Sequence, residues 1–135
     1  MVTHALVPVD SSENAGEILQ FALDNFTAAK VTLLHAINPT DQWIYPTEEK
    51  FESLVAEREE FIEELIEEVD FEDRNITTTI RRGDPREQIL DFVDNNEVDC
   101  VVLGSRGTGG PEMILLGSVA STVARRSPVT VVIVR

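Results

Sequence analysis

The spacing of apolar residues changes several times along the chain. Short apolar or alternating runs, typical of strands, fall at 4–9, 31–37, 75–80, 98–103 and 129–134. Helical spacing occurs at 15–26, 51–69 and 85–93 and in the segment after Gly117. Strands that alternate with helices predict an α/β, Rossmann-like fold with a parallel five-stranded sheet and helices on both faces. We take the first strand as central, which gives the strand order 3-2-1-4-5. Two runs, CVVL and VTVVIV, are apolar throughout, as strands covered on both faces are.

Local signals suggest where these elements begin and end. Either Ser11 or Ser12 can cap the first helix. In GDP at 83–85, Asp84 has the position of an N-cap, Pro85 that of the first helical residue, and Glu87 completes a capping box. Because proline lacks a backbone donor, Pro8 indicates that strand pairing stops near the end of the first strand.

The segment 38–48 contains two prolines and has no clear period, which predicts a loop. This loop carries Trp43 and Tyr45, either to a ligand or to the edge of the core.

Length and composition limit the class of protein. The 135 residues predict one domain spanning 1–135, and Cys100 lies in an apolar run as a small buried residue. There is no apolar run long enough to span a membrane and no signal peptide pattern, so we expect a cytoplasmic protein without a membrane partner. The net charge of −14 argues against nucleic acid as a partner.

An acidic surface with only two lysines, Lys30 and Lys50, also suits a salt-rich cytoplasm. We therefore hypothesise a halophilic source. The alternative is an acidic protein from a mesophile.

The chemistry is expected where the strand order reverses, beyond the carboxyl ends of the first and fourth strands. Asp10 follows one of these ends, and a glycine-rich segment from Gly104 follows the other. Glycines allow a close approach of backbone to a ligand, and Gly117 and Ser118 begin a helix whose N–H groups favour a phosphate. The Walker and GxGxxG signatures are both absent there.

The pattern Gly104-x2-Gly107-x9-Gly117-Ser118 resembles the nucleotide-binding motif of the ATP-binding branch of the universal stress protein family. The resemblance extends over the chain through PVDSSENA at 8–15, LLHAINP at 33–39, RGDP at 82–85 and SPVTVVIV at 127–134. It implies binding of ATP, or of AMP or ADP, with Mg²⁺. It assigns the ligand contacts to the following residues: Asp10, which also has the place of a Mg²⁺ contact, Ala36, Gly104, Arg106, Gly107, Gly117, Ser118 and Val119.

The resemblance further implies a homodimer through the last strand, Val129 to Val134. An exposed apolar edge strand of this kind needs a cover. One hypothesis is a binding module whose nucleotide state is read by an unknown protein partner. The alternatives are a slow ATPase or phosphotransferase using the same pocket, or a dimeric interaction protein that binds AMP or no nucleotide.

Several of these residues have a purely structural alternative. Asp10 and Ser118 can cap helices, and Arg106 can be a solvated loop residue. His4 and His35 fall on strands and are interpreted as packed or edge residues rather than a catalytic pair. The sequence contains no set of nucleophile, base and orienting acid, so it favours a binding module over an enzyme.

Overall fold

The computed structural model describes residues 1–10, 14–38, 47–69, 73–105 and 117–135. The chain forms β1 (His4–Pro8), α1 (Ala15–Asn25), β2 (Lys30–Ile37), α2 (Glu48–Glu68), β3 (Ile76–Arg82), α3 (Pro85–Asn95), β4 (Cys100–Gly104), α4 (Ser118–Arg126) and β5 (Thr130–Val134). All strand pairs are parallel, and the sheet order is β3-β2-β1-β4-β5. The predicted fold and strand order are confirmed.

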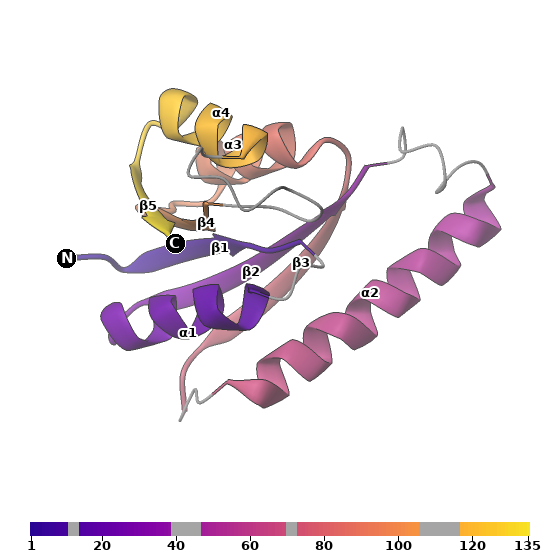
Figure 1. The fold of residues 1–135 in the computed structure, drawn as a ribbon, viewed down its shortest axis with the longest axis horizontal. Helices are drawn as coiled ribbons and strands as arrows, with labels where there is room; N and C mark the ends of the chain where they lie inside the picture. Colours follow the sequence, from indigo (N-terminus) through magenta and orange to yellow (C-terminus); the bar gives the residue numbers. More distant parts are fainter. Residues whose placement is uncertain (11–13, 39–46, 70–72, 106–116) are drawn as a thin grey trace.

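Two helical layers enclose the sheet (Figure 1). Helices α1 and α2 cover one face, and α3 and α4 cover the other. Successive residues of β1 serve opposite layers: Leu6 packs among residues of α3 and α4, and Val7 packs among those of α1 and α2. Cys100 is fully buried in the core beneath α1 and α2, as expected. In the described part of the chain, no helix is long and apolar enough to cross a membrane.

The helix starts differ in part from the sequence prediction. Helix α2 begins at Glu48, before the predicted Phe51, because the Thr47 side chain accepts a hydrogen bond from the Lys50 N–H at 3.1 Å. The N-cap of α1 is Asn14, while Ser11 and Ser12 lie outside the described residues.

Asp84 caps α3 as predicted, accepting from the Arg86 N–H at 2.9 Å. The Arg86 side chain donates to the same carboxylate and holds its pKa below the ordinary range. The Glu87 side chain pairs instead with Arg126 of α4 at 2.9 Å, so this glutamate links two helices.

Arg74 fixes the carboxyl end of α1. Its guanidinium donates to the carbonyls of Leu23 and Phe26 at 2.6 Å each, and to that of Ala29 at 3.0 Å. A cation at this end of a helix also complements the helix dipole. Through Arg74, the segment that leads into the edge strand β3 is thus bonded to the end of α1.

Pro8 determines how far β1 pairs with each neighbour. On the β2 side the ladder continues to Pro8, and the Val9 N–H donates to the Leu34 carbonyl at 2.9 Å. On the β4 side it contains only the pairs of Ala5 and Leu6. Backbone groups alternate between the two neighbours, and the position of Pro8 faces β4, where its missing N–H cannot contribute. The predicted stop in pairing therefore occurs on one side only, and β1 and β4 separate at their carboxyl ends.

Gly104 allows α1 to lie close to the end of β4. A Cβ atom at this glycine would lie 2.5 Å from the Cδ1 atom of Ile18, a separation that packed carbon atoms do not reach. The glycine therefore has a packing role at this position: it brings the start of α1 to the edge of the gap between β1 and β4.

We expect Gly104→Ala to destabilise the fold by about 1–3 kcal/mol through overpacking. Ile18→Val removes the Cδ1 atom at a cost of roughly 0.5–1.5 kcal/mol. The double variant should lose less stability than the sum of the two single variants, because the valine at position 18 has no Cδ1 atom to clash with the new Cβ atom. Urea unfolding of the four proteins measures this, and strictly additive costs would contradict the packing role of Gly104.

Candidate functional site

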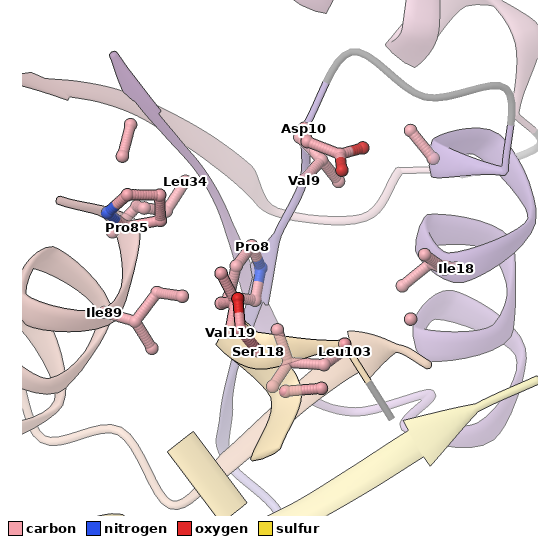
Figure 2. Close-up of a pocket in the computed structure, with 15 residues that line it drawn as sticks. Pro8, Val9, Asp10, Ile18, Leu34, Pro85, Ile89, Leu103, Ser118 and Val119 are labelled. Atoms are coloured by element: carbon pink, nitrogen blue, oxygen red, sulfur yellow. The ribbon is translucent and has the colours of Figure 1, made fainter. Parts of the chain in front are cut away.

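A cavity of about 330 Å³ opens where β1 and β4 separate. Figure 2 shows its lining side chains, which come from the carboxyl ends of β1, β2 and β4 and from the first turns of α1, α3 and α4. They are Pro8, Val9, Asp10, Ala15, Ile18, Leu34, Ala36, Pro85, Ile89, Leu103, Gly104, Gly117, Ser118, Val119 and Ala120. Small-molecule sites in open α/β sheets form at this switch point, and the volume falls in their usual range.

The first turn of α4 supplies hydrogen-bond donors to the cavity. The N-cap is Gly117, which has no side chain that could accept a hydrogen bond from the first turn. The first intrahelical bond runs from the Ser121 N–H to the Gly117 carbonyl at 2.9 Å. The N–H groups of Ser118, Val119 and Ala120 therefore have no acceptor within the helix, and the helix dipole adds partial positive charge there. This arrangement favours an anion.

The base of the glycine loop is held by the sheet. The Gly117 N–H donates to the Ser105 carbonyl at 2.8 Å, and the Ser105 N–H donates to the Val134 carbonyl at 2.9 Å. Gly117 has a φ of −66°, which any residue adopts, so a special backbone conformation does not explain this glycine. These bonds fix the start of α4 relative to β4 and β5.

His35 holds the last part of β1 in place. Its ring is buried, and its Nδ1 atom donates to the Val9 carbonyl at 2.9 Å, while the Val9 N–H bonds to Leu34. Burial lowers the pKa of His35, which favours the neutral ring, and Arg58 acts in the same direction. Val9, the residue before Asp10, is thus held at both its N–H and its carbonyl group.

Most side chains that line the cavity are apolar (Figure 2). Leu34, Pro85 and Ile89 form an apolar wall on the side of α3, and Ile18 contributes from α1. Among the described lining residues, Asp10 is the only one with an ionisable side chain. The described lining thus combines apolar side chains from α1 and α3 with the backbone donors of α4.

Six of the residues singled out from the sequence line this one cavity: Asp10, Ala36, Gly104, Gly117, Ser118 and Val119. Arg106 and Gly107 lie outside the described residues, as do Trp43 and Tyr45. Neither capping alternative holds in the described structure, because Asn14 is the N-cap of α1 and Gly117 is that of α4.

Sequence reasoning missed the role of His35 and the lining residues Ile18 and Pro85. The location of His35 on an interior strand was the available signal. Only the sheet register, which pairs Pro8 with Leu34, shows that its ring reaches Val9. Pro85 was recognised as a helix start, and the position of that start at the switch point makes it a lining residue.

The described residues contain no group of three or more His, Cys, Asp or Glu side chains that could hold a metal ion. A single carboxylate, that of Asp10, fits a cation bound mainly by ligand phosphates and water. Mg²⁺ is commonly bound in this way.

Comparisons with known proteins give a consistent result. The sequence model of the Universal stress protein family matches residues 1–135. Universal stress protein Sll1388 of Synechocystis sp. is 29% identical over 147 residues, covering 96% of each chain. The structure of MJ0577, a universal stress protein of Methanocaldococcus jannaschii, gives a TM-score of 0.84 at 30% identity and covers 99% of this chain and 96% of that one.

A more distant structure is a universal stress protein family protein from Arabidopsis thaliana with AMP bound. It gives a TM-score of 0.65 at 20% identity and covers 98% of this chain and 90% of that one, which is a likeness of fold. The match over all 135 residues, together with the sheet order and the nearly full-length relatives, shows that this chain belongs to the universal stress protein family.

Proposed function

We propose that the cavity between β1 and β4 binds an adenine nucleotide, with the phosphates at the first turn of α4. The observation that carries the proposal is the start of α4, where a glycine is the N-cap and where Ser118 and Val119 line a cavity that also contains Asp10. Backbone N–H groups and the helix dipole bind phosphate without lysine. The apolar wall at Leu34 and Ile89 suits a purine ring, with the Ala36 backbone at its edge. The AMP bound by the Arabidopsis relative supports this choice of ligand class.

ATP with Mg²⁺ is the preferred form of the nucleotide in this proposal. When bound, Mg²⁺ neutralises phosphate charge, which matters in a protein of net charge −14. Asp10 is the described residue that would contact it or the ribose. Gly104, Gly107 and Arg106 complete the proposed loop site. Arg106 would supply a positive charge within that loop.

The protein is proposed to act as a regulatory module in a stress response, with an unidentified protein partner reading its nucleotide state. Phosphoryl transfer needs a positioned nucleophile and charge stabilisation of the transferring group. Among the described lining residues, only Asp10 could act as a base. Of the residues in the proposed site, Arg106 alone carries a positive charge. We therefore expect retention of ATP rather than turnover.

The experiment that tests nucleotide binding begins by identifying any small molecule released on denaturing the purified protein. ATP, ADP, AMP and adenosine are then titrated into the emptied protein with Mg²⁺. We expect ATP to bind more tightly than adenosine, and less than one phosphate to be released per chain. Failure of every nucleotide to bind at millimolar concentration would overturn the proposal, and repeated turnover would favour an ATPase.

Ser118→Asp separates binding from folding. A carboxylate in the first turn of a helix is favourable by about 0.3–1 kcal/mol, so the melting temperature should not fall. The same charge repels phosphate, so ATP affinity should drop at least tenfold while adenosine affinity changes little. Ser121→Asp, which adds the charge at a residue that does not line the cavity, is the matched control. Equal effects of the two variants on ATP would contradict phosphate binding at Ser118.

His35 is proposed to position Asp10 through the Val9 carbonyl. His35→Phe keeps a ring but removes the donor, leaving a buried carbonyl unsatisfied at a cost of about 1–3 kcal/mol. His35→Asn keeps a donor where Nδ1 lies. Calorimetric titration with ATP should show weaker binding for His35→Phe than for His35→Asn, and equal affinities would contradict the positioning role.

The lowered pKa of His35 also predicts a pH dependence. Below the ordinary value of about 6.5 the unfolded chain binds the proton more readily than the folded chain, so stability falls as the pH drops through this window. His4, whose pKa burial also lowers, contributes in the same direction. His35→Asn should flatten this slope in urea unfolding between pH 7 and 5, and an unchanged slope would show that His35 is not its source.

We propose that the edge of the sheet formed by β5 makes a homodimer through Val129 to Val134. The Val134 carbonyl bonds to Ser105, so the alternation turns the backbone groups of Val131 and Ile133 outward. The four apolar residues of β5 are all half-buried. Two such strands, paired about a two-fold axis, cover each other.

Ile133→Pro removes an outward N–H without removing a bond to β4, and it should yield monomers. Ile133→Thr keeps the N–H group and should stay dimeric. Light scattering after size-exclusion chromatography measures both masses. A wild-type monomer, or a dimeric Ile133→Pro variant, would refute pairing through this edge.

A further inference from the structure

The outer edge of β3 carries backbone groups that the sheet does not use. The Val31 N–H donates to the Asn75 carbonyl, and the Gly83 N–H donates to the Ile37 carbonyl, at 3.0 and 2.9 Å. Odd-numbered residues of β3 therefore bond to β2. The N–H and C=O groups of the even-numbered residues Ile76, Thr78 and Ile80 point away from β2. No other described strand pairs with this edge.

A groove lies between this edge and α2. Its volume is about 360 Å³, and it is lined by Val55, Glu59, Ile62, Glu63, Ile66, Thr78, Thr79 and Ile80. Val55, Ile66 and Ile80 are only half-buried, and Thr78 is exposed. Figure 1 shows the long helix α2 running past β3. The groove thus combines an apolar floor, an unpaired strand edge and two carboxylates.

Few of the usual protections guard this edge. Natural edge strands carry proline, lysine or a bulge that blocks a further strand, whereas residues 76–80 are isoleucine and threonine throughout, paired in regular register. The two arginines that end β3 are engaged elsewhere: Arg82 pairs with Glu48 at 2.9 Å, and Arg81 lies over the Phe92 ring. The edge is therefore available for pairing.

The charge of α2 identifies the kind of partner. Ten glutamates and two basic residues fall within Glu48–Glu68. Pairing of β3 with the β3 of a second copy would bring two such helices together, which like-charge repulsion opposes. An added strand with basic side chains meets opposite charge at Glu59 and Glu63. Main-chain bonds would supply affinity, and alternate side chains in the groove would supply selectivity.

We propose that β3 and α2 together bind an extended, basic segment of a partner protein, which adds a sixth strand beside β3. Apolar side chains of that segment enter the groove at Val55, Ile66 and Ile80. Its arginines or lysines pair with Glu59 and Glu63. This surface is separate from the nucleotide cavity, so the inference stands whether or not the chain binds a nucleotide.

The probe is the capped peptide acetyl-RTVTVTR-amide, titrated into isotopically labelled full-length protein at low ionic strength. We expect saturable shifts of amide resonances in β3 and α2, with few changes at α4. The same peptide with glutamate in place of arginine should not bind. A peptide methylated at the backbone nitrogens that would pair with β3 should also fail to bind. Binding of all three peptides alike, or shifts only at other elements, would overturn the proposal.

Variants of the protein test the two parts of the surface separately. Thr78→Pro removes one outward N–H that β2 does not use, and it should abolish the shifts. Thr78→Val keeps that N–H and should bind like the wild type. The double change Glu59→Gln and Glu63→Gln should weaken binding roughly fivefold, the combined effect of two exposed ion pairs. Undiminished binding by both the Thr78→Pro and the double variant would refute the site, and the methylated peptide decides the matter if Thr78→Pro does not fold.

Discussion

The separation of β1 from β4 is the constraint on which the candidate site depends. A parallel sheet with its full set of bonds has no room between neighbouring strands. Here Pro8 offers no N–H toward β4, and the ladder on that side ends after Leu6. On the other side the Val9 N–H continues the ladder to Leu34. The end of β1 therefore stays with β2, and the cavity opens at the topological switch point.

In the proposed complex, the cavity would bind phosphate mainly through backbone N–H groups rather than through basic side chains. In a chain with 25 acidic and 11 basic residues, a lysine-lined pocket would compete with many nearby carboxylates. The N–H groups of a helix cannot turn toward nearby carboxylates as a lysine side chain can, because the helix fixes their direction. The bonds that join Gly117 to Ser105, and Ser105 to Val134, hold these donors against the sheet. The site is thus prepared by secondary structure before any ligand arrives.

Much of this arrangement could be predicted because it follows from local patterns. Apolar runs and helical spacing predicted the alternating strands and helices. With the first strand taken as central, the places of Asp10, Gly104 and Ser118 followed from the rule that sites form where the strand order reverses. Contacts between distant segments could not be predicted. The approach of Ile18 to Gly104 depends on the packing of α1 against β4, and no local signal in the sequence gives that distance. The bond from His35 to Val9 likewise depends on the register of two strands.

The glycine-rich segment shows how one residue type serves different purposes. Gly104 provides space for a helix, while Gly117 ends the loop with an ordinary backbone conformation. Glycine is therefore present at different positions of this motif for different physical reasons. Substitutions at these glycines should be interpreted individually for that reason.

The bond between His35 and Val9 links the side of the sheet that α2 covers to the cavity. The His35 ring lies on the α2 face, near the Phe61 ring at 6.4 Å between centroids, whereas the described cavity lining comes from α1, α3, α4 and the strand ends and includes no residue of α2. A sheet normally insulates one face from the other because neighbouring side chains point in opposite directions. Here the link is the main-chain carbonyl of Val9, which also lines the cavity. We therefore expect a change of side-chain volume beneath α2 to reach the cavity through this one oxygen atom.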